Sequence, residues 1–221
     1  MTAIAIDGPA GSGKSTVARL LSSRLGYLYL DTGAMYRAAA YLALRDGVAL
    51  DDGPSRASLT RAARIAFSPA GHVLARDADV SEEIRRPSVS AAVSEVSAHR
   101  EVRELLVAEQ RRIATGRDVV VEGRDIGTVV FPDAAVKVFL TAAAEVRAER
   151  RRKELIAAGE HTTAAETLAA MKARDTYDSS RAVSPLQKAA DAAEVDTSGM
   201  SIDEVVDALE ALVRRREGQP A

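Results

Sequence analysis

The sequence predicts an α/β fold in which a five-stranded parallel sheet is covered by helices. Five short apolar runs alternate with segments of helical character, an alternation typical of β-α-β units. A glycine-rich loop follows the first run, and polar residues follow others. Ligands of parallel sheets gather at the carboxyl ends of the strands, so these polar residues mark the expected site.

The five predicted strands are short and apolar. The first, residues 3–6, reads Ala-Ile-Ala-Ile and has no polar face, as expected for a strand buried on both sides. The others cover residues 28–30, 119–121, 136–140 and 193–195.

A phosphate-binding loop is predicted directly after the first strand. Residues 8–15 match the pattern G-x-x-x-x-G-K-[ST] in full, between a strand and a helix. Glycines let backbone amides approach a phosphate, and the N-terminus of the helix attracts an anion. Lys14 is expected to reach the β- and γ-phosphates of ATP, and Ser15 to bind Mg²⁺. The predicted ATP-binding residues are Gly8, Pro9, Ala10, Gly11, Ser12, Gly13, Lys14, Ser15 and Thr16.

Two helices carry clear local signals. After the phosphate loop, apolar residues recur on one helical face, and Gly26 stands where a glycine would end that helix. Ser201 and Glu204 form the pattern of a capping box that opens the last helix.

Residues 46–103 do not follow the strand–helix alternation. They are rich in Ala, Ser, Asp and Arg, with possible short strands at 64–68 and 72–75 around a turn at 68–71. We interpret this stretch as an inserted subdomain.

Residues 147–175 also depart from the alternation. Their composition is helical, but large apolar residues are few and basic residues crowd the first turns. The stretch is either a solvated helix face or a mobile lid that brings cations over ATP. The predicted core then comprises residues 1–45, 104–146 and 176–221.

Composition excludes several function classes. The net charge of −2 gives no overall positive field for a nucleic-acid polymer. The chain has no cysteine, hence no disulfide, thiolate nucleophile or Cys-based zinc site, and its three histidines are scattered. The N-terminus lacks the features of a signal peptide, and no apolar run of about 18 residues suggests a membrane span. We expect a cytoplasmic protein that binds neither nucleic-acid polymers nor membranes.

Four separated blocks resemble one family, the bacterial cytidylate kinases. The blocks are IDGPAGSGKST (6–16), LDTGAMYRA (30–38), VEGRDIGTVVFPDA (121–134) and RDTYDSSRAVSPL (174–186). Many families share the first block, whereas GRDIGTVVFPDA together with SRAVSPL is far narrower. The resemblance runs from Ile4 to about Val206. It implies a nucleoside monophosphate kinase core with a CMP-binding insert and a short lid, acting as a monomer on ATP, CMP and dCMP with Mg²⁺.

The resemblance also implies roles for individual residues. Arg37 and Arg124 would clamp the CMP phosphate. Ser94, Arg103 and Asp125 would contact cytosine, and Arg174 and Asp178 the sugar hydroxyls. Lys14 and Arg124 would act in catalysis with Arg181, Arg147 and Arg151, which would face the transferring phosphate. The other expected CMP-binding residues are Thr32 and Glu122; family members often have Asp at the latter position, one methylene shorter.

Simple physics supports two further expectations. Asp125 can accept a hydrogen bond from the cytosine amine, whereas uracil would present an acceptor there, so CMP and dCMP should be preferred over UMP. Ser94 and Arg103 stand nine residues apart, about 180° around a continuous helix. Since both are expected to face one base, we predict a helix break near Ala98–Glu101.

Three other functions remain as alternatives. A kinase for another nucleoside monophosphate would share the same core, and the preferred base separates the two. A GTPase-like switch would be expected to carry an N-K-x-D tetrad that reads the base, and the chain has none. An ATPase motor or regulatory protein would turn over ATP without an acceptor and would usually be longer.

Overall fold

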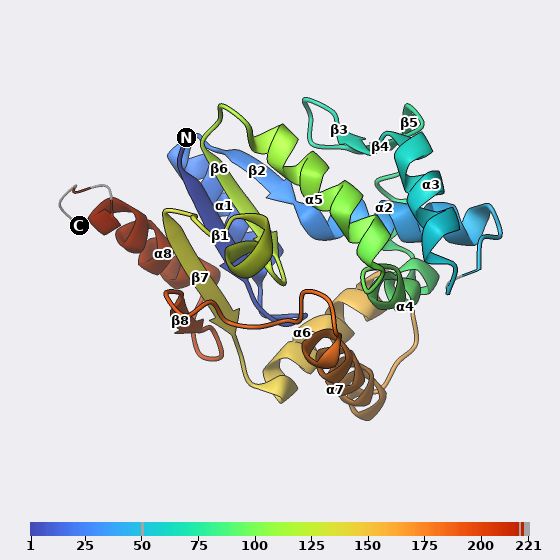
Figure 1. Ribbon diagram of the computed structural model, residues 1–221. Helices are drawn as coiled ribbons and strands as arrows, with labels where there is room; N and C mark the ends of the chain where they lie inside the picture. Colours follow the sequence, from blue (N-terminus) through green and yellow to red (C-terminus); the bar gives the residue numbers. More distant parts are fainter. Residues whose placement is uncertain (50, 217, 219–221) are drawn as a thin grey trace. The chain divides into compact units, whose positions relative to one another are not determined.

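The computed structural model describes residues 1–49, 51–216 and 218 (Figure 1). The chain divides into two compact units. The first comprises Met1–Leu30 and Ala114–Ala221, and the second comprises Asp31–Ile113.

The first unit is built on a five-stranded sheet with the order β2-β6-β1-β7-β8. Its strands are β1 (Ala3–Asp7), β2 (Leu28–Asp31), β6 (Val119–Gly123), β7 (Val136–Thr141) and β8 (Ala193–Asp196). Strand β1 pairs in parallel with β6 and β7, and β7 pairs in parallel with β8. The predicted parallel sheet and all five strand positions are confirmed.

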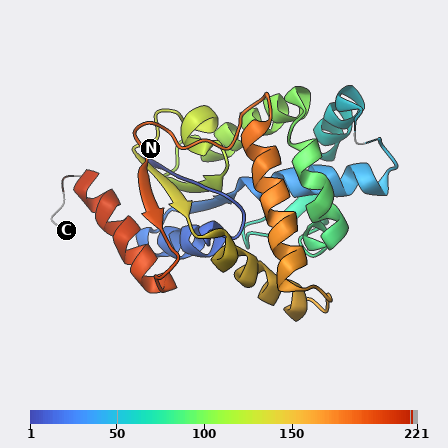
Figure 2. The same cartoon turned by 90° about the horizontal axis from the view of Figure 1, so that it is seen from below.

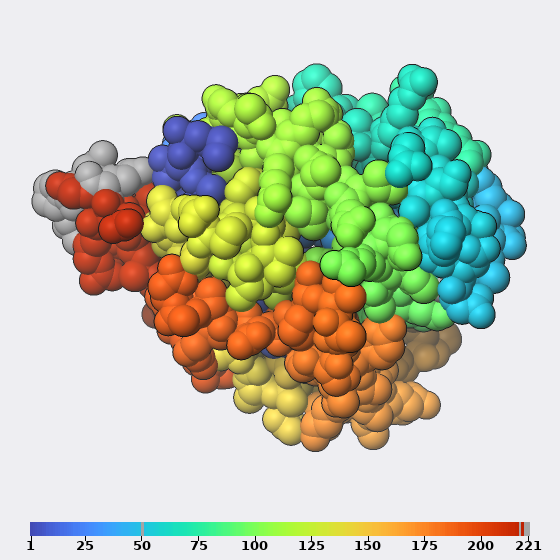
Figure 3. Space-filling model, in the orientation of Figure 1, coloured from blue at the N-terminus to red at the C-terminus, as the bar shows by residue number. Residues whose placement is uncertain are grey.

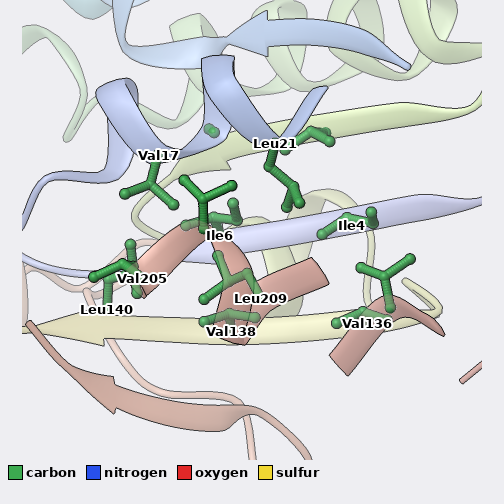
Figure 4. Packing of buried hydrophobic residues seen from close by; sticks show 13 residues of the cluster. Ile4, Ile6, Val17, Leu21, Val136, Val138, Leu140, Val205 and Leu209 are labelled. Atoms are coloured by element: carbon green, nitrogen blue, oxygen red, sulfur yellow. The ribbon is translucent and has the colours of Figure 1, made fainter. Parts of the chain in front are cut away.

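Helices α1 (Lys14–Leu25) and α8 (Ile202–Arg216) pack against each other and against the sheet. Figure 4 shows the resulting core, in which Ile4 and Ile6 of β1 meet Leu21 of α1 and Leu209 of α8. All four side chains are fully buried, and each such burial contributes about 1.5–3 kcal/mol. This packing holds the start of α1 at the carboxyl end of β1.

Both predicted helix-end signals are confirmed. Gly26 ends α1 with a φ of 69°, in the left-handed region that suits glycine. Ser201 Oγ accepts a hydrogen bond from the backbone N–H of Glu204, and the Glu204 carboxylate accepts one from the backbone N–H of Ser201.

Two further helices, α6 (Ala144–Ala157) and α7 (Ala164–Ser180), lie side by side (Figure 2). They contain most of the stretch expected to form a lid. A capping box of Thr163 and Glu166 opens α7. Atoms of α7 and of the segment that follows it form part of the molecular surface (Figure 3).

The second unit is mostly helical. It contains α2 (Thr32–Arg45), α3 (Gly53–Ala63), a short 3₁₀ turn η1 (Glu83–Arg85), α4 (Pro87–Val96) and most of α5 (Arg100–Ala114). Helix α2 packs against α3, α4 and η1. The unit therefore extends beyond the expected insert, residues 46–103, at both ends.

A three-stranded antiparallel sheet completes this unit, with β3 (Ala66–Phe67), β4 (Val73–Ala75) and β5 (Ala78–Asp79). The first two strands and their turn match the prediction, and the backbone N–H of Gly71 donates to the Ser68 carbonyl over 2.9 Å. Strand β5 was not predicted, because it has only two residues and both are exposed.

The predicted helix break is confirmed. Helix α4 ends at Val96 and α5 begins at Arg100. The hydroxyl of Ser97 donates to the carbonyl of Ser94, so a side chain satisfies part of the end of α4 without glycine or proline.

Candidate functional site

The glycine-rich loop needs glycine where it passes closest to other backbone. Gly8 has a φ of 148°, and a Cβ there would lie 2.0 Å from the carbonyl oxygen of Leu140. Gly11 has a φ of 73°, and a Cβ there would lie 3.0 Å from the carbonyl oxygen of Arg147. The loop is thus held between β7 and α6, and its shape depends on these two residues.

Lys14 begins α1 and folds back into the loop. Its Nζ donates to the carbonyl of Pro9 over 2.6 Å and to Ser12 Oγ over 3.3 Å. Burial lowers the pKa of Lys14 well below its usual 10.5, and the positive charge of Arg124 lowers it further. An anionic ligand bound here would stabilise the charged form of this buried amine.

Ser15, in the first turn of α1, and Glu122, near the carboxyl end of β6, lie within hydrogen-bonding distance of each other. Ser15 Oγ donates to Glu122 Oε2 over 2.9 Å, and the hydroxyl of Tyr29 donates to Glu122 Oε1. One carboxylate therefore accepts from both hydroxyls. These hard oxygens suit Mg²⁺, which prefers oxygen ligands.

Asp178 of α7 lies between two of the predicted arginines. Its Oδ2 is 3.3 Å from Arg124 Nε and 3.8 Å from Arg174 Nε. The Asp178 side chain is buried, so its loss would leave two guanidinium groups without this counter-charge. The structure thus brings Arg124, Arg174 and Asp178 together.

Arg181 and Asp125 form a second, looser pair. Arg181 Nη2 lies 3.9 Å from Asp125 Oδ1, and both side chains are buried. Arg181 Nε also donates to the carbonyl of Ser184 over 2.6 Å. The guanidinium of Arg181 is thereby oriented by the segment after α7.

The two other predicted lid arginines lie in different surroundings. Arg147 is buried, and its guanidinium donates to the carbonyls of Ala142 and Ala10 and pairs with Asp175 over 2.7 Å. A role at the transferring phosphate would require Arg147 to give up some of these contacts. Arg151 forms a surface ion pair with Glu154 on its own helix.

The second unit holds the other predicted residues. Asp31 caps α2 by accepting from the backbone N–H of Ala34, and it pairs with Arg37 Nη2 over 2.8 Å. Gly33 leaves room for the ion pair between Arg37 and Asp31, because a Cβ at Gly33 would lie only 3.1 Å from Arg37 Nη1. Thr32 is buried at the first turn of the same helix.

Arg103 of α5 is buried beside the break between α4 and α5. Its Nη1 donates to the carbonyl of Ser97 over 3.2 Å, and Ser97 Oγ donates to the carbonyl of Ser94. The guanidinium carbon lies 5.3 Å from the ring centroid of Tyr36, a cation–π contact. Ser94 and Arg103 therefore adjoin the same turn, as the prediction of a break required.

Sequence reasoning missed three residues at these sites: Asp7, Tyr29 and Tyr36. The carboxylate of Asp7 accepts hydrogen bonds from the backbone amides of Ile126 and Gly127. Burial raises the pKa of Asp7 from 3.8 to about 6, against the opposing effect of these hydrogen bonds. Asp7 directly follows a predicted strand, and that position was the available signal.

The fold and the first unit's site define a class of protein. A five-stranded parallel sheet with a phosphate loop between β1 and α1 is the core of the P-loop kinases. A gluconokinase from Sinorhizobium meliloti 1021 shares this fold, with a TM-score of 0.51 at 16% identity over 98% of this chain and 94% of the other.

Sequence comparison identifies the family within that class. Residues 4–215 match the family described as cytidylate kinase. A cytidylate kinase from Geobacter sulfurreducens is 48% identical over 97% of this chain and 93% of the relative. One from Rhodococcus opacus is 53% identical over 97% of this chain and 96% of the relative. The chain belongs to the cytidylate kinase family, which confirms the resemblance and the prediction of a kinase.

None of the described helices combines the length and the apolar character that a membrane span requires. Among the same residues, His, Cys, Asp and Glu side chains form no group of three or more that could hold a metal ion.

Proposed function

We propose that this chain transfers the γ-phosphate of ATP to CMP or dCMP, giving ADP and CDP or dCDP. One arrangement carries the proposal. The buried Lys14 of the phosphate loop lies close enough to the half-buried Arg124 for their two positive charges to repel. The negative charge of the phosphoryl group in transfer would relieve that repulsion. Membership of the cytidylate kinase family supports CMP or dCMP as the acceptor.

On the donor side, residues Gly8–Thr16 would hold ATP. Ser15 would bind Mg²⁺ together with phosphate oxygens, with Glu122 adjacent to it. The ion would neutralise charge on the transferring group. Lys14, Arg124 and Arg181 would spread positive charge over the phosphoryl oxygens, with Arg147 and Arg151 joining them if α6 and α7 act as a lid.

On the acceptor side, the proposed roles are those implied by the resemblance. Arg37 and Arg124 would bind the CMP phosphate, since an arginine fork donates two parallel hydrogen bonds to phosphate oxygens. The cytosine contacts would come from Ser94, Arg103 and Asp125. The sugar contacts would come from Arg174 and Asp178, with Thr32 and Glu122 completing the acceptor set.

The acceptor is already an anion, so the reaction needs no strong general base. Positioning and charge neutralisation would supply most of the rate enhancement. Closure of residues 46–103 and 147–175 would exclude water and suppress hydrolysis of ATP.

The decisive experiment measures ADP release with ATP, Mg²⁺ and a panel of CMP, dCMP, UMP, AMP, GMP and dTMP. We expect CMP and dCMP to be preferred over UMP by roughly 100-fold or more in kcat/KM, because uracil would leave a buried group unpaired. A higher kcat/KM for UMP or AMP would overturn the proposal. ADP release without any acceptor would point to an ATPase.

Family membership also supports a proposal for the setting of the reaction. We propose that the chain works as a monomer in the cytoplasm, in pyrimidine nucleotide metabolism. Size-exclusion chromatography with light scattering tests the monomer, with a mass near 23.4 kDa expected.

A further inference from the structure

The last residue of β1 reaches across the sheet to the segment that follows β6. Asp7 Oδ1 accepts from the backbone N–H of Ile126 over 2.8 Å, and Oδ2 accepts from that of Gly127 over 2.7 Å. Asp7 is only 4% exposed. It lies opposite Gly123 in the parallel pairing of β1 with β6. Each oxygen of one buried carboxylate is therefore used by a different amide.

These two amides begin a short π-helical turn, η2 (Ile126–Val130). At the start of an α-helix, an aspartate in the position before the first helical residue commonly accepts hydrogen bonds from the first free amides. Asp125 holds that position, yet its side chain makes no capping hydrogen bond. Asp7 performs the capping from another strand, and the Asp125 carboxylate lies 3.9 Å from Arg181 instead.

Gly127 lies between Asp7 and a side chain of β7. A Cβ there would lie 3.4 Å from Asp7 Oδ2, an ordinary van der Waals distance, and 3.2 Å from a side-chain carbon of Lys137. Asp7 and Lys137 therefore both pack against Gly127.

We propose that Asp7 is a positioning residue that fixes the backbone carrying Arg124 and Asp125, and so controls recognition of the nucleotide acceptor. This inference rests on the proposed function. Arg124 and Asp125 directly precede the two amides that Asp7 holds, so a shift of those amides moves both side chains. Asp7 itself acts through the backbone and is assigned no contact with substrate.

The test is Asp7→Asn in the full-length enzyme. Asparagine keeps the size of aspartate but offers only one oxygen, so its NH₂ group would face one of the two amide N–H groups. The equivalent of one lost hydrogen bond predicts an increase of about tenfold in KM for CMP and a similar fall in the CMP-to-UMP ratio of kcat/KM. Affinity for ADP alone, measured by calorimetry, should change less than affinity for CMP, because both hydrogen bonds of the Asp7 carboxylate go to the turn after β6, although its charge also acts on Lys14.

Ser201→Ala is the matched control. It also removes a helix-capping side chain of the first unit, but α8 carries no proposed site residue. A purely structural role for Asp7 would make both variants behave alike, with lower melting temperatures and an unchanged CMP-to-UMP ratio. That result would overturn the inference, as would an equal loss of ADP and CMP affinity in Asp7→Asn.

A second variant covers the case in which Asp7→Asn does not fold. Asp7→Glu keeps both acceptor oxygens but moves them outward by one methylene, and it should raise KM for CMP and lower the CMP-to-UMP ratio in the same sense. An unchanged ratio in a folded Asp7→Glu enzyme would count against Asp7. Failure of the wild-type enzyme to phosphorylate CMP would instead refute the proposed function, so the two failures are distinguishable.

Discussion

The buried carboxylate of Asp7 predicts a specific dependence of stability on pH. Its pKa rises from 3.8 to about 6 in the folded protein, chiefly because burial disfavours the charged form. Between these values the folded chain binds a proton that the unfolded chain does not. Asp7 therefore stabilises the fold most at low pH, and this contribution is lost as pH rises through 6.

The size of the effect follows from the two pKa values. At about 1.4 kcal/mol for each pKa unit, the difference is worth about 3 kcal/mol in total, of which about 2 kcal/mol lies between pH 4.5 and 8. Asp7→Asn lacks the titrating group. The free energy of unfolding of Asp7→Asn, relative to that of the wild type, should therefore rise by about 2 kcal/mol from pH 4.5 to pH 8.

Urea unfolding followed by far-UV circular dichroism measures this difference at each pH. The hydrogen bond lost in Asp7→Asn shifts all values by a constant and does not disturb the slope. Ser22→Ala serves as the control, since the Ser22 hydroxyl donates to the backbone carbonyl of Arg19 rather than to a titrating side chain, and its difference from the wild type should be independent of pH. A difference for Asp7→Asn that stays constant within about 0.5 kcal/mol would refute a raised pKa for Asp7.

Two other side chains give separate predictions. Arg181→Ala should lower kcat by about 100-fold or more with a smaller change in KM for CMP, because a positive charge that would face the transferring group is lost. Arg112→Ala, which breaks a surface pair with Glu109, is its control, and an unchanged kcat in Arg181→Ala would exclude Arg181 from catalysis. Tyr29→Phe should raise the Mg²⁺ concentration needed for half-maximal binding of ATP by about tenfold at most, because Glu122 loses one hydrogen bond. Equal Mg²⁺ dependence of nucleotide binding in Tyr29→Phe and the wild type would contradict the link between Tyr29 and Glu122.

Local signals were enough to predict much of the fold. The five strands, the end of α1 at Gly26 and the capping box at Ser201 each depend on residues that are neighbours in the chain. The break between Ser94 and Arg103 was also predicted, from the geometry of a continuous helix. The limits of the second unit were not predicted, because they depend on how α2 packs against α3 and α4.

The residues of the site also fall into those that local sequence signals predicted and those that they missed. Gly8–Thr16 were recognisable because one segment of chain forms the whole phosphate loop. Tyr29 was missed because its partner, Glu122, lies 93 residues away in the sequence. The buried contacts of Arg147 were equally invisible, since one of them joins residues 137 positions apart.

Contiguous patterns of residues were sufficient to predict the class of fold, the phosphate loop and the family. The contacts between side chains became known from the folded structure alone. It assigned Asp7, rather than Asp125, to cap the turn after β6, and it placed Asp178 between Arg124 and Arg174. The physical reason is that hydrogen bonds and ion pairs depend on distance in space, and neighbouring strands of a parallel sheet bring together residues more than 100 positions apart.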